Sequence, residues 1–132
     1  MKNILIFRTD RIGDFLVCSS IYSSIKRKNK NCSIDIVCSN FNFKYVKSFE
    51  FFNNVYLYPS KLFNKFIFYF KLNRYDEILV LDGKKRSIYF SLLNKSKSKI
   101  MYTPSKFIKN IFHFFFDLVF LIDYKIPKID LI

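Results

Sequence analysis

The chain has 132 residues and a formal net charge of +13 at pH 7, and a quarter of its residues are charged. This length suits one domain that buries about two-thirds of its unfolded surface, and the apolar run before Arg8 is too short for a secretory signal peptide. Three cysteines without a Cys-x-x-Cys pair (Cys18, Cys32 and Cys38) favour reduced thiols in a cytoplasmic protein over a disulfide framework.

The positive charge has two interpretations. It favours attraction to an anionic partner such as a phosphorylated glycolipid, a nucleotide sugar, an acidic bilayer or nucleic acid. However, Phe, Ile, Lys, Asn and Tyr dominate the chain, and Ala and Gln are absent, as AT-rich codons would produce. Lysine would then replace other surface residues without a binding role. The densest basic clusters, Lys26–Lys28 and Lys84–Arg86, are short.

Short apolar runs alternate with stretches of helical periodicity, which is typical of a parallel α/β sheet. Right-handed crossovers would wind them into a three-layer, Rossmann-like α/β domain over residues 1–132, with strand order 3-2-1-4-5 and the first strand central. In chain order we expect strand Lys2–Phe7, helix Asp14–Lys28, strand Ser33–Cys38, helix Phe41–Ser48, strand Val55–Tyr58, helix Leu62–Leu72, strand Glu77–Leu81, helix Ser87–Leu93, strand Lys99–Tyr102 and helix Ser105–Leu121.

Helical spacing predicts which faces of these helices are buried. The first helix would bury Phe15, Cys18, Ile21, Tyr22 and Ile25, and the third would turn Phe63, Phe66, Ile67 and Phe70 inward. The apolar run Ile111–Ile122 contains His113 and Asp117. It is shorter than the roughly 20 residues that cross a bilayer, so we expect a buried or interfacial helix, with His113 packed or at its surface.

Ligands of an open parallel sheet bind beyond the carboxyl ends of its strands. The loops at that edge are expected to be Arg8–Asp14, Ser39–Asn40, Asp82–Arg86 and Thr103–Pro104. They contain neither a Gly-x-Gly-x-x-Gly fingerprint nor a Gly-Lys-Ser/Thr motif. No cluster of metal ligands can be assembled from the sequence, so we expect no metal site.

The stretch Lys2–Asp14, KNILIFRTDRIGD, resembles the N-terminal signature of glycosyltransferase family 9, which includes the heptosyltransferases of lipopolysaccharide core assembly. That signature is a basic strand, an Arg-Thr/Ser-x-x-x-Gly-Asp loop and an apolar helix. Tyr75–Ser87 and Ser98–Tyr102 are similar to later family segments, so the resemblance spans roughly residues 2–105. Two departures are Cys18-Ser19-Ser20 in place of Thr-Thr-Pro, and Val80 in place of an Asp.

The resemblance implies inverting transfer of heptose or a related sugar from a nucleoside diphosphate sugar, such as ADP-heptose, to a lipopolysaccharide core or similar anionic lipid-linked acceptor. The reaction would occur at the cytoplasmic face of the inner membrane, with a peripheral association possible, and without a cofactor or obligatory metal. Family enzymes are two-domain GT-B proteins. This chain would be the N-terminal, acceptor-side domain without the donor-binding domain, inactive alone or dependent on a separate partner.

Two other interpretations remain. The chain can be a non-catalytic half-Rossmann module that binds an anionic glycolipid or a nucleotide. A nucleic-acid-binding protein is disfavoured because the aromatic residues are expected at core-facing positions rather than interleaved with Arg as a stacking platform.

Asp14 is the candidate catalytic residue. The resemblance makes it the general base that accepts the proton of the attacking sugar hydroxyl, and Gly13 would let the acceptor approach the backbone closely at a tight turn. The local chemistry equally favours an N-cap, because an Asp carboxylate accepts hydrogen bonds from the free N–H groups of a first helical turn.

The basic residues among the candidate acceptor-binding residues have structural alternatives. The acceptor would contact Arg8, Thr9, Arg11, Gly13, Lys84 and Arg86. Arginine pairs well with carboxylate or phosphate, but Arg8 and Arg11 can instead form salt bridges with Asp10 or Asp14. The basic group at Lys84–Arg86 can be a solvated loop, and Asp82 can bind a hydroxyl or simply form a turn with Gly83.

Overall fold

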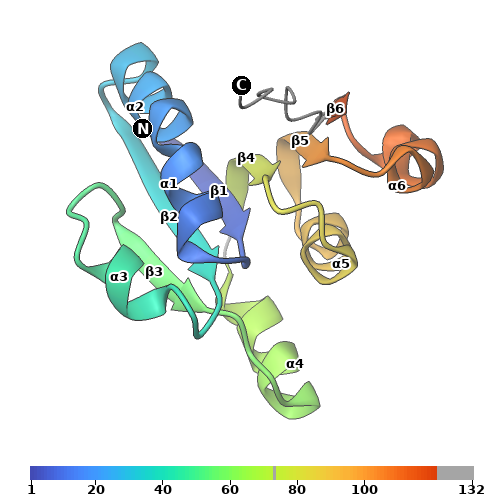
Figure 1. Cartoon of the computed structure of the whole chain (residues 1–132), viewed down its shortest axis with the longest axis horizontal. Helices are drawn as coiled ribbons and strands as arrows, with labels where there is room; N and C mark the ends of the chain where they lie inside the picture. The colour runs from blue at the N-terminus through green and yellow to red at the C-terminus, as the bar shows by residue number, and fades with distance from the viewer. Residues whose placement is uncertain (73, 122–132) are drawn as a thin grey trace, which may run out of the picture.

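A computed structural model describes residues 1–72 and 74–121 of the chain. Six parallel strands form one sheet in the order β3-β2-β1-β4-β5-β6, so the predicted order 3-2-1-4-5 is confirmed and one strand is added. Figure 1 shows β1 in the middle of this sheet. The strands are β1 (Lys2–Arg8), β2 (Cys32–Cys38), β3 (Asn54–Leu57), β4 (Tyr75–Val80), β5 (Ser96–Thr103) and β6 (Leu118–Leu121).

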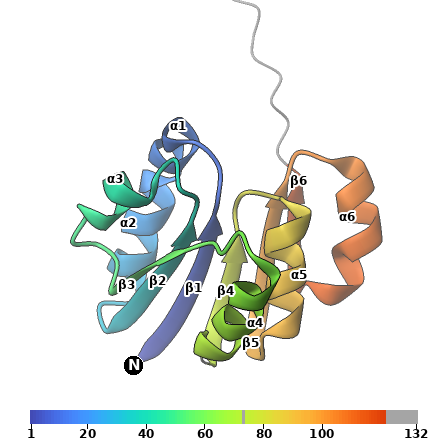
Figure 2. The ribbon, with the colours of Figure 1, turned by 90° about the horizontal axis from the view of Figure 1, so that it is seen from below.

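Helices cover both faces of the sheet and make three layers (Figure 2). On one face lie α1 (Ile12–Val17), α2 (Ser19–Lys28) and α3 (Phe43–Lys47); on the other lie α4 (Leu62–Lys71), α5 (Lys85–Leu93) and α6 (Lys106–Phe112).

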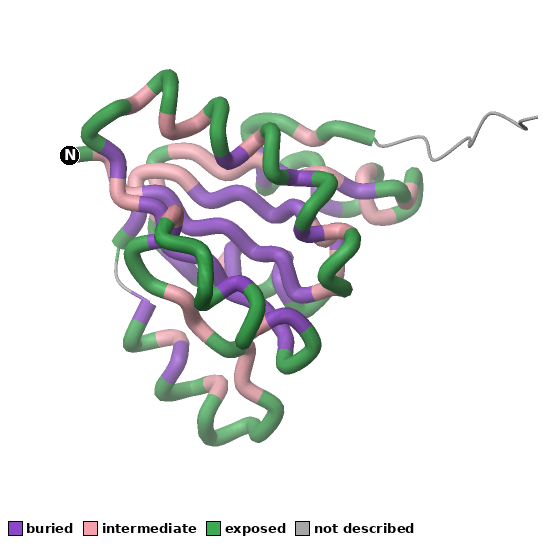
Figure 3. Tube along the Cα trace, turned by 60° about the vertical axis from the view of Figure 1, so that its left-hand side comes forward, coloured by how far each residue is buried: buried purple, intermediate pink, exposed green. Residues whose placement is uncertain are grey.

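Alternation along β1 builds two cores. Ile4 and Ile6 face α1 and α2, whereas Leu5 and Phe7 face the α4–α6 layer, and all four are at most 1% exposed. A strand buried on both faces reads as a continuous apolar run, as β1 does. In Figure 3 the buried residues are concentrated in the middle of the molecule, where β1 and its neighbours β2 and β4 lie.

The predicted helix Asp14–Lys28 is two helices. α1 ends at Val17, and Cys18 lies between it and α2 with φ −84° and ψ 2°. The predicted buried face is confirmed at Phe15, Cys18 and Tyr22, while Ile21 and Ile25 pack partly buried against the same core. The chain turns at Cys18, within the segment where it departs from the family pattern.

The predicted inward face of the third helix is wrong. In α4 the side chains of Phe63, Phe66, Ile67 and Phe70 are 50–73% exposed, and Phe68 packs against the sheet instead. The helix is apolar around most of its circumference, so spacing alone did not select the inner side.

The predicted helix Ser105–Leu121 is wrong in its second half. α6 ends at Phe112, the 3-10 turn His113–Phe115 follows, and β6 then pairs in parallel with β5. Asp117 directs this change, because its backbone N–H donates to Lys99 O (2.8 Å) and its carboxylate accepts from Lys99 N (2.6 Å). The open edge of β5 needs backbone partners, and a short apolar run suits a strand as well as a helix.

The buried or interfacial helix predicted for residues 111–122 is therefore wrong beyond the 3-10 turn His113–Phe115, and Ile122 lies outside the described residues. His113 is exposed, and its ring contacts Phe114. Among the described residues, no helix has the length and apolarity that a membrane crossing needs. The expectation that the aromatic residues face the core is wrong for several of them, namely Phe41, Phe63, Phe66, Phe70, Phe107 and Phe114.

Candidate functional site

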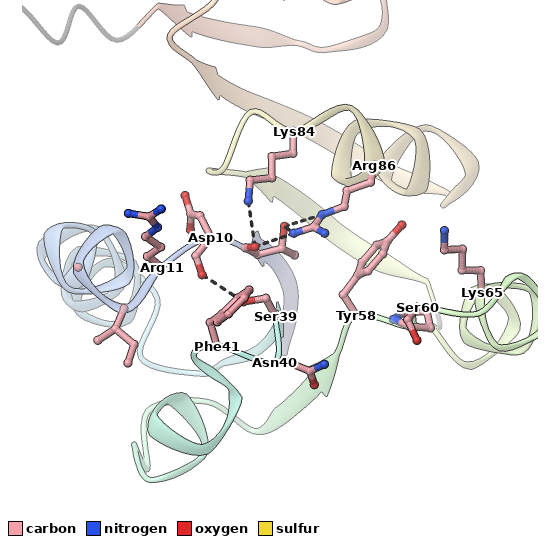
Figure 4. A pocket seen from close by; sticks show the side chains of 14 residues that line it. Asp10, Arg11, Ser39, Asn40, Phe41, Tyr58, Ser60, Lys65, Lys84 and Arg86 are labelled. Carbon is pink, nitrogen blue, oxygen red and sulfur yellow. Dashed lines mark hydrogen bonds between the residues drawn. The ribbon is translucent and has the colours of Figure 1, made fainter.

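An open cavity of about 940 Å³ lies beyond the carboxyl ends of β1, β2 and β3. Three chain segments line most of it: residues 9–13 after β1, residues 39–41 after β2 and residues 58–60 after β3. Lys65 of α4, together with Lys84 and Arg86 at the start of α5, completes the lining (Figure 4). The predicted meeting of loops at this edge is thus found for three of the four loops.

The fourth predicted loop does not contribute. Thr103 is fully buried, and its hydroxyl accepts a hydrogen bond from the backbone N–H of Ser105 (3.2 Å), so it closes the turn into α6. The segment Tyr58–Ser60, which sequence reasoning did not select, occupies the cavity wall instead.

Asp82 ties the loop after β4 to the loop after β1. Its Oδ2 accepts from Thr9 N (3.1 Å), Thr9 Oγ1 (2.5 Å) and Ser87 Oγ (2.6 Å), and its Oδ1 accepts from Lys84 N (3.1 Å). The turn-forming alternative is found for Asp82, and the hydroxyl groups that it binds belong to Thr9 and Ser87 of its own chain.

Gly83 completes that turn. It has φ 59°, and a Cβ there would lie 3.0 Å from Tyr102 O. This left-handed conformation strongly favours glycine.

Arg86 and Lys84 reach across to Thr9. Arg86 Nη2 donates to Thr9 O (2.7 Å) and Thr9 Oγ1 (2.9 Å), and Lys84 Nζ donates to Thr9 O (3.2 Å). The Arg86 guanidinium also lies over the Tyr58 ring at 4.9 Å, a cation–π contact. We call Thr9, Asp82, Arg86 and Ser87 the Thr9–Asp82 network. Arg86 belongs to this network and Lys84 bonds to it, so both side chains have partners in the chain at the cavity, although Arg86 is exposed. Lys85 is exposed and does not line the cavity, as the solvated-loop alternative expects.

Arg8 is a structural residue in this arrangement. It is 3% exposed, and its guanidinium donates to Leu81 O and to Asp14 O (2.9 Å). Its Nε lies 3.1 Å from Asp10 Oδ1, an ionic contact without hydrogen-bond geometry, and its Nη2 lies 3.8 Å from Asp14 Oδ1. The salt-bridge alternative is therefore found for Arg8, which does not line the cavity.

Arg11 differs from Arg8. It is exposed and lines the cavity, and none of the ion pairs found among the described residues includes it. Its guanidinium is the basic group of the first loop that remains open to a ligand.

Asp10 is the carboxylate that lines the cavity, and sequence reasoning did not select it. Burial raises its pKa to about 6, an effect that Arg8 opposes and that the negative charges of Asp82 and Asp14 reinforce. Its side chain is 16% exposed, and the hydroxyl of Ser39 and the amide of Asn42 hold its backbone carbonyl at 3.1 Å. The sequence feature that could have indicated Asp10 is its position between Arg8 and Arg11, in a loop rich in Asp and Arg.

Asp14 lies one residue beyond the part of this loop that lines the cavity, in the first turn of α1. Its side chain is 46% exposed. The N-cap position is Arg11, and no side chain caps this helix, so the N-cap alternative for Asp14 is wrong.

Gly13 is the second residue of α1, with no left-handed φ, so the expected tight turn is absent there. A Cβ on Gly13 would meet no heavy atom within 4 Å. Glycine at this position leaves open space beside the cavity.

Val80, where the family pattern has an Asp, is fully buried among apolar side chains of the α4–α6 layer. This position therefore contributes no polar group to the site.

No protein-family model and no curated protein matches the sequence. The fold, however, is shared with solved glycosyltransferases. E. coli ADP-heptose lps heptosyltransferase II matches with a TM-score of 0.69 and 17% identity over 93% of this chain and 35% of its own. The E. coli heptosyltransferase WaaC with ADP-2-deoxy-2-fluoro heptose matches with a TM-score of 0.75 and 14% identity. This match covers 95% of this chain and 44% of its own.

A glycosyltransferase family 9 protein from Veillonella parvula DSM 2008 matches with a TM-score of 0.72 and 14% identity over 92% of this chain and 36% of its own. The chain has the Rossmann-like fold of one half of a GT-B glycosyltransferase. The predicted resemblance is thus confirmed at the level of the fold. The chain spans less than half the length of each of these proteins.

Proposed function

We propose that this chain is the N-terminal, acceptor-side domain of an inverting glycosyltransferase. The complete enzyme would transfer heptose or a related sugar from a nucleoside diphosphate sugar, such as ADP-heptose, to an anionic lipid-linked saccharide of the lipopolysaccharide core type. The observation that carries this proposal is the cavity beyond β1, which combines the exposed Arg11 with the carboxylate of Asp10, next to the half-exposed Asp14, on the fold of known heptosyltransferases.

The acceptor is held through its negative charge. Arg11 offers a free guanidinium, and Lys65 adds a second cationic group at the α4 side of the cavity. Lys84 and Arg86 already donate to Thr9, so they contribute a fixed positive field more than free donors. Phosphate or carboxylate groups on a saccharide suit this arrangement because arginine binds them through paired hydrogen bonds.

The chemistry needs a base and a departing diphosphate. The acceptor hydroxyl oxygen bonds to the anomeric carbon of the donor while its proton passes to Asp14. The bond between that carbon and the diphosphate oxygen breaks, and attack from the opposite face inverts the configuration. The half-exposed carboxylate of Asp14 is reachable by a substrate. Asp10 is the competing base, because a carboxyl with a pKa of about 6 suits proton transfer near neutral pH.

The donor is held by a second domain, on the same polypeptide or on a partner. The share of the matched proteins that the chain spans supports this part of the proposal. Without the groups that stabilise the leaving diphosphate, the chain alone would turn over negligibly. We place the reaction in the cytoplasm, at the inner face of the membrane. A lipid-linked acceptor would be within reach there, and the reducing environment keeps cysteines as free thiols. A non-catalytic module that binds the same anionic saccharide is the second candidate, favoured by the same partial span.

Calorimetric titration of the full 132-residue chain with a deacylated, phosphorylated lipopolysaccharide-core oligosaccharide tests the proposal. We expect saturable binding, which Arg11→Gln weakens about 3–10-fold through the lost charged hydrogen bonds. Arg27→Gln removes the same charge from α2, outside the cavity, and should bind as the wild type. Equal weakening in both variants would mean that net charge alone attracts the ligand, and it would refute an acceptor site in the cavity.

A further inference from the structure

The outer face of α4 is unusually apolar for a surface helix. Leu62, Phe63, Phe66, Ile67 and Phe70 are 83%, 73%, 64%, 50% and 65% exposed, and the Phe66 and Phe70 rings contact each other at 4.9 Å. We call these five side chains the α4 apolar face. Scattered exposed apolar residues need no explanation, but a contiguous set on one helix indicates an interaction site.

The helix needs this face neither for its own docking nor for the core. The opposite side supplies Phe68, which packs with the α4–α6 layer, and Leu72, which follows the helix and is also buried. Tyr69, half-buried, donates from its hydroxyl to Leu93 O (2.8 Å). Helical spacing places Phe63, Phe66, Ile67 and Phe70 on the side away from these contacts.

Basic side chains accompany the apolar face, and acidic ones do not. Lys61, Lys71 and Arg74 are exposed at its two ends, and the chain has no Asp or Glu between Glu50 and Asp76. Aromatic rings beside lysine and arginine, on a helix about 15 Å long, are suited to lying flat in the headgroup region of an anionic bilayer.

The helix that carries the apolar face begins next to the cavity. Tyr58, Pro59 and Ser60 line the cavity and lead through Lys61 into α4, and Lys65 of the same helix also lines the cavity (Figure 4). Lys65 lies on the inner side of α4 with Phe68, so a bilayer on the apolar face would be separated from the cavity by about one helix diameter, roughly 10 Å. A lipid-linked acceptor would span that distance.

We propose that the α4 apolar face is a membrane-docking surface that inserts its aromatic side chains into the interface of an anionic lipid bilayer, while Lys61, Lys71 and Arg74 contact lipid phosphates. The biological sense of this surface rests on the proposed function. The binding itself does not require donor, acceptor or turnover, so the two proposals fail separately.

Flotation of the full chain with vesicles tests this surface. We expect binding to vesicles of phosphatidylcholine with about 30% phosphatidylglycerol, and at least tenfold weaker binding to phosphatidylcholine alone. Phe63→Ser/Phe66→Ser/Phe70→Ser should weaken binding to the anionic vesicles at least tenfold, because three inserted rings are lost. The matched control Phe107→Ser/Ile111→Ser/Phe114→Ser removes three side chains that are also exposed, in the α6 region, and should bind as the wild type. Circular dichroism should show that both variants are folded.

A second measurement locates the insertion. The chain has no tryptophan, so Phe66→Trp introduces a single fluorophore on α4 and Phe114→Trp introduces one outside it. Anionic vesicles should shift the emission of the first variant to shorter wavelength and leave that of the second unchanged.

Three results would overturn the proposal: unchanged vesicle binding of the α4 triple variant, a blue shift in the Phe114→Trp variant but not in the Phe66→Trp variant, or no vesicle binding by the wild type. Loss of single-stranded RNA binding or of self-association in that triple variant, with vesicle binding unchanged, would assign the surface to those partners instead.

Discussion

The Thr9–Asp82 network and the neighbouring segment Asp10–Asp14 border the same cavity but are built differently. In the network each polar group has partners within the chain, and Thr9 and Ser87 are at most 1% exposed. In the segment, Arg11 and Gly13 are exposed, and the carboxylates of Asp10 and Asp14 contact only Arg8 among the described ion pairs. Groups with satisfied partners stabilise the fold, whereas groups with free capacity can bind ligands.

This difference predicts that substitutions in the segment alter activity and substitutions in the network alter stability. The largest effect should follow Asp14→Asn in a longer form of the protein, or in a complex with a donor-binding partner. If Asp14 is the base, turnover should fall about 10²–10⁴-fold because no carboxylate accepts the proton. The unfolding transition should hardly move, since this side chain is 46% exposed and does not cap α1. Steady-state sugar transfer and a thermal melt measure the two quantities.

Asp10→Asn is the matched control for that experiment. A smaller loss of turnover than in Asp14→Asn would support Asp14 as the base. Near-normal transfer in Asp14→Asn, together with a large loss in Asp10→Asn, would move the base to Asp10.

Within the network, Asp82→Ala should destabilise the fold by about 2–4 kcal/mol, because two buried hydroxyls lose a charged acceptor. Urea denaturation followed by circular dichroism gives this value. Glu50→Ala removes an exposed carboxylate that belongs to none of the ion pairs found among the described residues, and this variant should unfold close to the wild type. An Asp82→Ala protein as stable as the wild type would mean that the network does not stabilise the fold.

Asp10 should make stability depend on pH in the direction opposite to an ordinary salt-bridged carboxylate. Its pKa is about 6 in the folded chain against 3.8 for an unperturbed Asp, so the folded state binds more protons between these values. Stability from this group therefore falls as pH rises through that window, by about 1–3 kcal/mol in total. Asp10→Asn lacks this loss, so its stability relative to the wild type should increase between pH 4 and pH 7.

Urea denaturation at the two pH values measures that change. Asp76→Asn provides a control of opposite sign. A hydrogen bond from the backbone N–H of Asn3 lowers the pKa of Asp76 most, and a bond from Lys97 lowers it further. The stability of the wild type relative to this variant should therefore increase as pH rises. Parallel behaviour of the two variants would contradict the assigned environment of Asp10.

The two glycines should give the smallest effects, with opposite signs. Gly83→Ala forces an L side chain into φ 59° against Tyr102 O and should cost about 1–2 kcal/mol. Gly13→Ala sits in a helix with open space around its Cβ and should stabilise by about 0.5–1 kcal/mol. Thermal melts measure both. Reduced acceptor affinity in a stabilised Gly13→Ala protein would show that the open space serves the ligand.

The sequence by itself determined the parallel α/β fold, the central place of β1 and the edge at which the loops after β1, β2 and β4 meet. These features follow from local rules: buried strands are apolar, helices repeat every 3.6 residues and crossovers are right-handed. The tertiary structure alone decided which side of α4 faces the sheet and that Leu118–Leu121 is a strand on the free edge of β5. It also decided that Arg8 is held by the chain away from the cavity, and that Thr9 lines the cavity with its polar groups bonded within the chain, while Arg11 lines it without an ion pair to any described residue. Those outcomes depend on partners far along the chain, such as Thr9 and Asp82, which are 73 residues apart, and no local pattern records them.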